Sequence, residues 1–439
     1  MSPIIIKGIQ LLLSLSLLVV LHELGHFIPA KLFKTRVEKF YLFFDVKFAL
    51  FKKKIGGTEY GIGWLPLGGY VKISGMIDES MDTEQMNLPP EPWEFRSKPA
   101  WQRLIIMLGG VIVNLILGFF IYMMIHLVWG KDTLTSEAVP NGMDVTVLAE
   151  SVGFQDGDRI LKVDGEVLDN VYNLNKYLFL RSVSEVEVQH PSGVKETLQI
   201  PEDFGSQMFE SGDLRPVGIL FPAVIEVQPN SPAATSGLET GDLILSTNGV
   251  AINNYSFLVD HIKKEQYDTL HIELKRGNDQ IITKTVLPRE DGTIGIGFYS
   301  NSIEYTHVDL NLSESISAGF TYGYWTLHDY AAQFKYVFTK KGASQVGGFA
   351  AIGSLFPAEW DWLGFWSSTA LLSIILAFMN ILPIPALDGG HVMFLLYEMI
   401  SGRKPNDRFM EYAQMFGFFL LLALLLFANG NDVYRAITG

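Results

Sequence analysis

Long apolar stretches near both ends of the chain are separated by polar regions. The apolar stretches cover approximately the residues 4–33, 104–129, 363–382 and 416–427. A helix needs about 20 apolar residues to cross a hydrocarbon core, so the pattern predicts four transmembrane helices, of which the fourth is short. The first stretch is too long for a signal peptide and has no small-residue cleavage site. Tryptophans at the ends of the second and third stretches are typical of an aromatic belt.

The charged residues between these stretches predict the topology. Lys and Arg are abundant in the connections that follow the first and third stretches, whereas the long middle region is acidic. Since cytoplasmic loops carry the excess of Lys and Arg, we expect these two connections in the cytoplasm, with the middle region and both termini outside. The net charge of -14 argues against nucleic acid as a partner. The chain has no cysteine, so any metal must be held by His, Asp or Glu.

The middle region contains an internal sequence repeat. Residues 153–165 (GFQDGDRILKVDG) match residues 237–249 (GLETGDLILSTNG), and each is followed by a helical stretch and an alternating strand. Such repetition indicates two similar domains. The pair resembles tandem PDZ domains, with two generic small β-rich domains as the alternative. Because no clear carboxylate-binding glycine loop is present, binding of peptides by strand addition is left open.

After this region, residues 312–341 read as a helix of mixed polarity with many aromatic side chains. Such a helix either lies against the membrane surface or packs against the rest of the protein. The sequence alone leaves both arrangements open.

The first apolar stretch carries His22-Glu-Leu-Gly-His26 near its end. Residues four apart share one face of a helix, so both imidazoles can reach a single metal ion. Glu23 lies beside this pair and is a candidate general base for hydrolysis. Ionisable groups inside a span are costly and therefore indicate function. The alternative is a polar cluster that only pairs across helices.

A catalytic zinc takes three protein ligands and keeps one position open. Residues 380–391 (NILPIPALDGGH) supply a third candidate, Asp388, at the end of the third stretch. Because the first and third spans both run inward, Asp388 is expected in the same leaflet as the histidines, and this expectation comes from counting charges. The two prolines break the helix before it. Asp388 as a helix N-cap and His391 as a competing ligand are the alternatives.

In combination, these motifs resemble the site-2 protease family of intramembrane zinc metalloproteases, over nearly the whole chain. The resemblance implies Zn²⁺ bound by His22, His26 and Asp388, with Glu23 as the catalytic base. It also implies that several residues in two segments, 68–70 and 380–385, contact the substrate. These are Asn380, Gly68, Gly69, Tyr70, Pro383 and Pro385.

Residues 61–72 (GIGWLPLGGYVK) resemble the membrane-dipping β-hairpin of this family, which pairs with an unwound substrate strand. An ordinary surface hairpin would show the same alternation and glycines. Residues 108–114 (LGGVIVN) resemble a Gly-Pro-x-x-Asn element of the family, but Val111 stands where the family has proline. Likewise, residues 345–353 (QVGGFAAIG) have Gly348 where the family usually has proline. These departures concern packing and loop rigidity rather than the metal site.

The expected fold is a polytopic α-helical membrane protein with four transmembrane helices, a membrane-associated β-hairpin and two extracytoplasmic α+β PDZ domains. The expected divisions are a membrane domain with the first two helices, two PDZ domains, a membrane-associated helical linker, and a region with the last two helices. Their residues are, in this order, 1–130, 131–220, 221–305, 306–360 and 361–439.

The resemblance implies a zinc metalloendopeptidase of the bacterial inner membrane that cuts the transmembrane segments of single-span proteins. Its substrates would be an anti-sigma factor already trimmed by another protease, in envelope-stress signalling, and remnant signal peptides. The PDZ pair would exclude substrates with bulky outer domains. A monomer is expected, although the residues do not determine the oligomeric state. A non-catalytic membrane adaptor and a zinc enzyme acting on lipid or prenyl substrates are the alternative functions.

Overall fold

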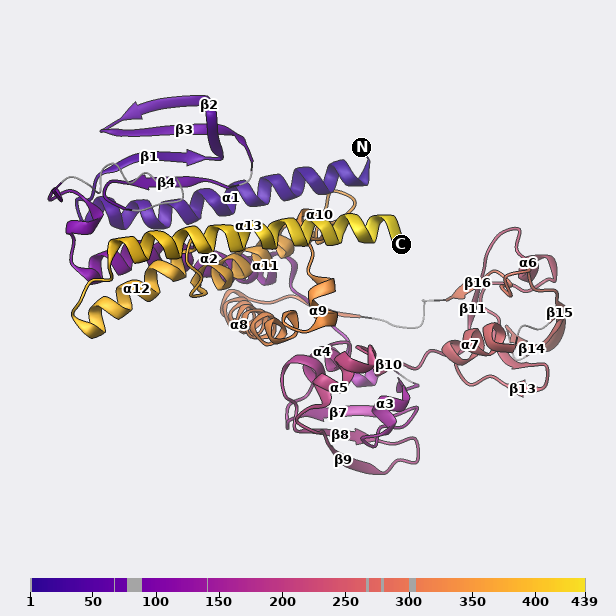
Figure 1. Cartoon of the computed structure of the whole chain (residues 1–439). Coiled ribbons are helices and arrows are strands. Elements are labelled where there is room, and N and C mark those ends of the chain that lie inside the picture. Colours follow the sequence, from indigo (N-terminus) through magenta and orange to yellow (C-terminus); the bar gives the residue numbers. More distant parts are fainter. Residues whose placement is uncertain are drawn as a thin grey trace. The chain divides into compact units, whose positions relative to one another are not determined.

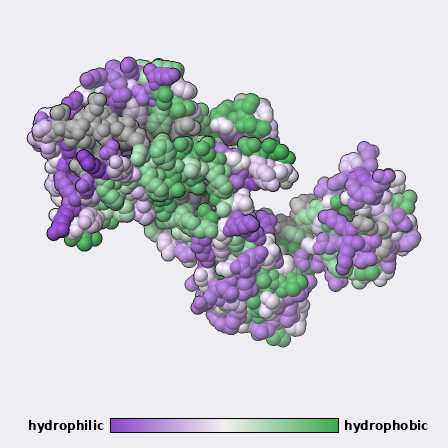
Figure 2. All heavy atoms as spheres, in the orientation of Figure 1, coloured by the Kyte–Doolittle hydropathy of each residue, from purple (hydrophilic) through white to green (hydrophobic). Residues whose placement is uncertain are grey.

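The computed structural model describes residues 2–66, 68–76, 89–139, 141–265, 268–277, 280–299 and 305–438. The chain forms two compact units, each of which is described here by itself: unit 1 contains Met1–Gly130 and Asp309–Gly439, and unit 2 contains Lys131–Val308. Figure 1 shows that long helices dominate unit 1, and Figure 2 shows a broad hydrophobic surface over these helices. The visible surface of unit 2 is largely hydrophilic (Figure 2).

Unit 1 is built mainly from helices. They are α1 (Pro3–Leu32), α2 (Ala100–Trp129), α8 (Leu312–Val337), α9 (Lys340–Gln345), α10 (Phe349–Ser354), α11 (Trp362–Ile381), α12 (Asp388–Ser401) and α13 (Asp407–Thr438), with a 3₁₀ turn η2 (Phe95–Ser97). Helices α1, α2, α11 and the part Arg408–Thr438 of α13 are long and apolar enough to cross a membrane. Four spans therefore fit the predicted polytopic membrane protein. The expected limits of the fourth, 416–427, were too narrow, because hydropathy marks only the apolar middle of a helix whose ends are polar.

Helix α2 lies at the centre of the bundle and contacts α1, α8, α11 and α12. It approaches α1 closely at Gly109, where an added Cβ would lie 1.9 Å from the carbonyl oxygen of Gly25. Gly319 of α8 meets α2 in a similar way, because a Cβ there would lie 2.5 Å from the Cα of Met123. Small residues at such crossings let membrane helices approach closely. Helix α8 therefore packs against another helix on one face, as one of the two alternatives predicted.

A four-stranded sheet of unit 1 packs against α1 (Figure 1). Its strands are β1 (Val37–Leu42), β2 (Phe44–Ile55), β3 (Thr58–Leu65) and β4 (Tyr70–Ile73), in the order β2-β3-β1-β4. Strand β1 is parallel to β3 and antiparallel to β4, and the antiparallel hairpin is β2–β3.

The expected β-hairpin at residues 61–72 is therefore wrong. This segment contains the end of β3 and most of β4, with β1 between them, and Leu67 lies outside the described residues. The alternation of side chains marks strands but does not name their partners. Strand β1 takes the central place because Phe40 packs against Phe27 of α1, with ring centroids 5.5 Å apart, and Tyr60 of β3 joins the same cluster. Among the described strands, β4 therefore lies at the edge of this sheet.

Unit 2 mixes short strands and helices. Its strands are β5 (Lys131–Thr133), β6 (Met143–Val145), β7 (Arg159–Val163), β8 (Glu185–Gln189), β9 (Lys195–Gln199), β10 (Val217–Ile219), β11 (Ile225–Val227), β12 (Leu243–Thr247), β13 (Val250–Ala251), β14 (Leu270–Arg276), β15 (Gln280–Val286), β16 (Ile296–Phe298) and β17 (Thr306–Val308). Its helices are η3 (Ser136–Ala138), α3 (Val147–Glu150), α4 (Asn173–Leu180), α5 (Phe204–Ser211), α6 (Pro232–Thr235) and α7 (Tyr255–Glu265). The larger sheets have the orders β7-β8-β9 and β13-β12-β14-β15. Two separate hydrophobic cores are formed, one from residues between 134 and 219 and the other from residues between 223 and 294.

Candidate metal centre

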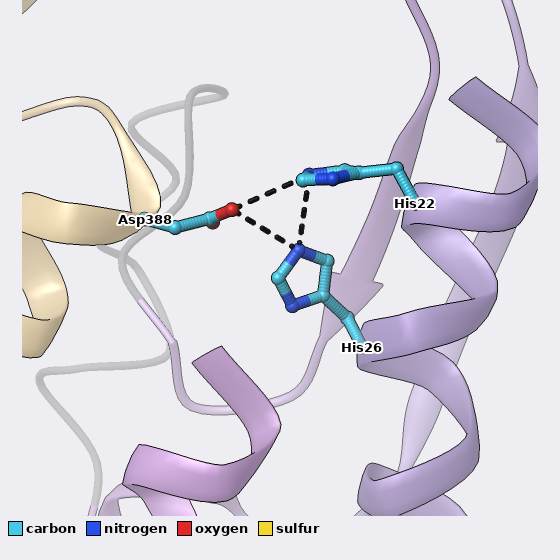
Figure 3. Close-up of side chains that lie close together, drawn as sticks. All are labelled: His22, His26 and Asp388. Carbon is cyan, nitrogen blue, oxygen red and sulfur yellow. Dashed lines mark hydrogen bonds and ion pairs between the residues drawn. The ribbon is translucent and has the colours of Figure 1, made fainter. Parts of the chain in front are cut away.

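Three side chains from two distant segments of unit 1 converge, as Figure 3 shows. His22 and His26 lie one turn apart on α1, and Asp388 is the first residue of α12. The N-cap of α12 is Leu387, which provides no side-chain capping hydrogen bond. The alternative of Asp388 as the N-cap residue is therefore wrong, and its carboxylate is directed at the histidines. Ala386, just before, has φ of 76°, a left-handed conformation that costs an L-residue about 1–2 kcal/mol.

The distances between the three ligand atoms suit one zinc ion. The Nε2 atoms of His22 and His26 are 3.2 Å apart, and Oδ2 of Asp388 lies 3.3 Å from the first and 3.4 Å from the second. A tetrahedron with metal–ligand bonds of about 2.0–2.1 Å has edges of roughly 3.3–3.4 Å. The three atoms thus form one face of such a tetrahedron. An ion bound to all three would keep its fourth position open.

The hydrogen bonds around these atoms support the same conclusion. Nδ1 of His26 lies 2.7 Å from the carbonyl oxygen of Ile106, so this nitrogen donates its hydrogen and Nε2 keeps a free lone pair. Among the residues that the structure describes, the buried Oδ2 of Asp388 receives no hydrogen bond. A carboxylate oxygen that is buried between two imidazole nitrogens and accepts no hydrogen bond is costly without a cation. The donor set therefore fits zinc, which prefers imidazole and carboxylate ligands of this kind.

Helix α2 makes room for this cluster at Gly110. A Cβ at this position would lie 2.4 Å from Nε2 of His26 and 2.6 Å from Cε1 of His22. A glycine is therefore needed where the two imidazoles meet the second span. The sequence reasoning did not assign Gly110 to the site. The available signal was the resemblance of residues 108–114 to a Gly-Pro-x-x-Asn element, which includes Gly110.

A cavity of about 390 Å³ opens beside the three ligand atoms, and Glu23, Gly69 and Tyr70 line it together with them. The Glu23 carboxylate lies beside the main-chain amide of Val71 in β4. Close contact between β4 and α1 requires Gly69, since a Cβ there would lie 2.6 Å from Cγ1 of Val19. The candidate general base, the ligands and the edge strand therefore share one cavity.

Other predicted residues lie elsewhere. Asn380 is in the last turn of α11, and Pro383 and Pro385 follow that helix. These three and Gly68 are absent from the described lining of the cavity, so their contact with substrate stays a prediction. His391 does line the cavity.

Nε2 of His391 lies 2.6 Å from the side-chain amide of Gln414 in α13. The cluster of ligand atoms found among the described residues does not include it. The sequence reasoning considered His391 only as a competing ligand and missed Gln414, for which no local signal exists.

The chain was compared with known proteins. The sequence model of peptidase family M50 matches residues 10–424. The chain belongs to this family. Its relatives include the regulator of sigma E protease of Haemophilus influenzae, 27% identical over 97% of this chain and 98% of the relative. The regulator of sigma-E protease RseP of Escherichia coli is 27% identical over 97% of both chains. A putative zinc metalloprotease of Borreliella burgdorferi is 28% identical over 96% of both.

Membership of family M50 confirms the resemblance to the site-2 proteases that the motifs indicated. The protein is accordingly a metalloprotease of the site-2 type, with relatives named as zinc metalloproteases or as regulators of sigma E. The match extends over most of α1, over α2, α11 and α12, and over the first part of α13, so it includes every residue of the converging cluster.

Proposed function

We propose that this M50 peptidase hydrolyses peptide bonds within the transmembrane segments of single-span membrane proteins, with Zn²⁺ held by His22, His26 and Asp388. The observation that carries the proposal is the triangle of ligand atoms with edges of 3.2–3.4 Å at the wall of a cavity that also contains Glu23. The two histidines come from a helix that can cross the membrane, and Asp388 follows another such helix. The cavity is therefore within reach of a neighbouring transmembrane segment.

The chemistry is amide hydrolysis. A zinc ion held by His22, His26 and Asp388 would lower the pKa of its bound water to about 7 and polarise a carbonyl group. Glu23 accepts a proton from the attacking water and returns it to the leaving amine. The amide of Val71 beside its carboxylate helps to hold Glu23 toward the cavity. Asn380 is the candidate donor to the developing oxyanion, by family resemblance.

A transmembrane helix hides its carbonyl groups in internal hydrogen bonds, so the substrate must unwind before cleavage. Strand β4 supports this step because it is an edge strand whose residues Tyr70, Val71 and Lys72 line the cavity. An extended substrate segment that adds to the outer side of β4 would gain main-chain hydrogen bonds. Strand β4 alone, rather than a hairpin at 61–72, would then pair with the unwound substrate strand.

Matching structural details in the two halves of unit 2 support its assignment as a PDZ pair. Asp158 and Asp242 hold the same place in the two matched segments, are fully buried, and each accepts a hydrogen bond from the main-chain N–H three residues earlier. The register between paired strands also shifts at matching places, after Ile160 in β7 and after Ile244 in β12. Matching bulges and buried carboxylates favour duplication of one domain, divided near residue 220 between the two cores.

The proposed orientation follows from the positive charges. The connection that carries the sheet and the connection before α13 are rich in Lys and Arg, which favours the cytoplasm for both. Unit 2 would then lie outside the inner membrane and exclude substrates with bulky outer domains. The names of two relatives refer to sigma E. We therefore propose as substrates a trimmed anti-sigma factor, whose cleavage releases a cytoplasmic fragment in envelope-stress signalling, and remnant signal peptides.

The test uses purified full-length protein in detergent and a model single-span substrate. Wild type should contain stoichiometric zinc and cleave within the span. Glu23→Gln should keep its zinc but lose cleavage by a factor of 10² or more, and Asp388→Ala should lose most of its zinc. Persistent turnover by Glu23→Gln would show that the base is wrongly assigned. Hydrolysis of lipid or prenyl substrates instead of the peptide would replace the proposed activity with the alternative one.

A further inference from the structure

Asn114 of α2 contacts the side of the His22 ring that faces away from the candidate metal position. Its side chain is 1% exposed, and its amide nitrogen lies 3.2 Å from Nδ1 of His22, the ring nitrogen turned away from Asp388. Its Oδ1 is buried and, within the described part of the chain, unpartnered. Buried polar groups are normally satisfied by hydrogen bonds. The only side-chain partner recorded for this buried amide is a candidate metal ligand, which points to a role at the metal site.

The chemistry of the imidazole decides what this amide can do. A neutral imidazole that binds a metal through Nε2 carries its hydrogen on Nδ1. That hydrogen needs an acceptor, and Oδ1 of Asn114 reaches the same position when the amide turns over. Turning breaks no other recorded hydrogen bond, since neither end of the amide is bonded to a described group besides His22. For His26, the carbonyl oxygen of Ile106 already serves as the acceptor.

Asn114 is also tied to the span that leads to the third ligand. Its main-chain oxygen accepts a hydrogen bond of 2.6 Å from the hydroxyl of Ser373 in α11, and Ser373 is completely buried. The Asn114 residue of α2 thus contacts both α1, which carries the histidines, and α11, which leads to Asp388. Its amide is therefore held at a fixed place relative to His22.

We propose that Asn114 is the positioning residue of His22: its amide oxygen accepts the hydrogen of Nδ1 and directs the lone pair of Nε2 at the metal. This inference rests on the proposed function, since it requires zinc at His22, His26 and Asp388. Hydrogen-bond partners of ligating histidines typically change metal affinity by 10- to 100-fold.

The experiment measures zinc affinity by competition with a chelator of known affinity, on full-length protein in detergent. Asn114→Leu keeps the approximate shape but removes the acceptor, and its affinity should fall by about 10- to 100-fold. Asn114→Asp keeps an acceptor, as in the carboxylate–histidine–zinc arrangement, and should stay within about threefold of wild type. Ser373→Ala is the matched comparison, because it removes the hydrogen bond to the main-chain oxygen of Asn114 but keeps the amide acceptor, so its zinc affinity should fall by less than that of Asn114→Leu.

The melting temperature of the zinc-free form separates positioning from packing. Asn114→Leu should leave it near the wild-type value and reduce only the increase that added zinc produces. If Asn114→Leu does not fold, Asn114→Ala takes its place in the same comparison with Asn114→Asp. Wild-type zinc affinity in the variant without the acceptor, or an equal loss in Asn114→Asp, would overturn the inference. A failure of the proposed function itself would look different from a failure of this inference. In that case wild type would hold no zinc, or Asp388→Ala would bind zinc as tightly as wild type.

Discussion

Replacing Gly110 by alanine should remove the metal while leaving the helix bundle intact. The new Cβ would lie 2.4 Å from Nε2 of His26, whereas ordinary contacts begin at 3.4 Å, so the ring nitrogen must retreat by about 1 Å. Metal–ligand distances tolerate deviations of only about 0.2 Å. A displacement of this size at a reacting centre would cost about 10²-fold in kcat/KM, or about 2.7 kcal/mol, even if the metal stayed bound, and loss of the metal costs more.

Stability should not fall in parallel. The atoms that the Cβ meets are the far ends of the imidazole rings of His22 and His26, which can rotate away once no ion holds them. Alanine is also favoured over glycine inside a helix by roughly 1 kcal/mol. The zinc-free melting temperature of Gly110→Ala should therefore equal or exceed that of wild type, while zinc content and cleavage of a transmembrane substrate collapse.

Gly109→Ala is the matched control, one residue earlier on the same helix. Its Cβ would meet the main-chain oxygen of Gly25, which cannot rotate away, so α1 and α2 must separate. This variant should lose zinc-free stability as well as activity. The reasoning would be refuted by stoichiometric zinc and wild-type cleavage in Gly110→Ala, or by equal losses of zinc-free stability in the two variants.

Three further predictions concern the edge strand, the metal and unit 2. Gly69→Ala should push β4 from Val19 of α1 and lower kcat/KM about tenfold with zinc content unchanged, and unaltered kinetics would contradict pairing of substrate with β4. Removal of zinc by a chelator should abolish cleavage reversibly and, relative to zinc at 100 times its Kd, cost about 2.7 kcal/mol of stability, measurable as a lower melting temperature. Hydrogen bonds to Glu196 and Asp158 raise the pKa of His190 above its ordinary value of 6.5. The stabilisation by His190 should therefore be complete below that value and disappear as the pH rises through the raised pKa, so calorimetry of His190→Gln against wild type should show a difference that shrinks toward alkaline pH.

Much of the candidate site could be predicted from local sequence. The spacing of His22 and His26 depends only on the period of a helix, and the hydropathy of the spans depends only on adjacent residues. Counting of Lys and Arg placed Asp388 at the depth of the histidines, and the structure brings their ligand atoms within 4.8 Å of one another. The family resemblance then follows from motifs each of which is contiguous in the chain, and the family match over residues 10–424 confirms it.

Only the tertiary structure decided the features that depend on partners far apart in the chain. Strand β1 separates β3 from β4 because Phe40 packs against α1, and no local pattern in 61–72 reveals this. Gly110 and Asn114 belong to the site because α2 crosses α1 beside the histidines, at a place set by the glycines of both helices. Periodicity thus determined the elements and the ligand types of this protein, whereas packing between distant residues determined the edge strand and the surroundings of the metal ligands.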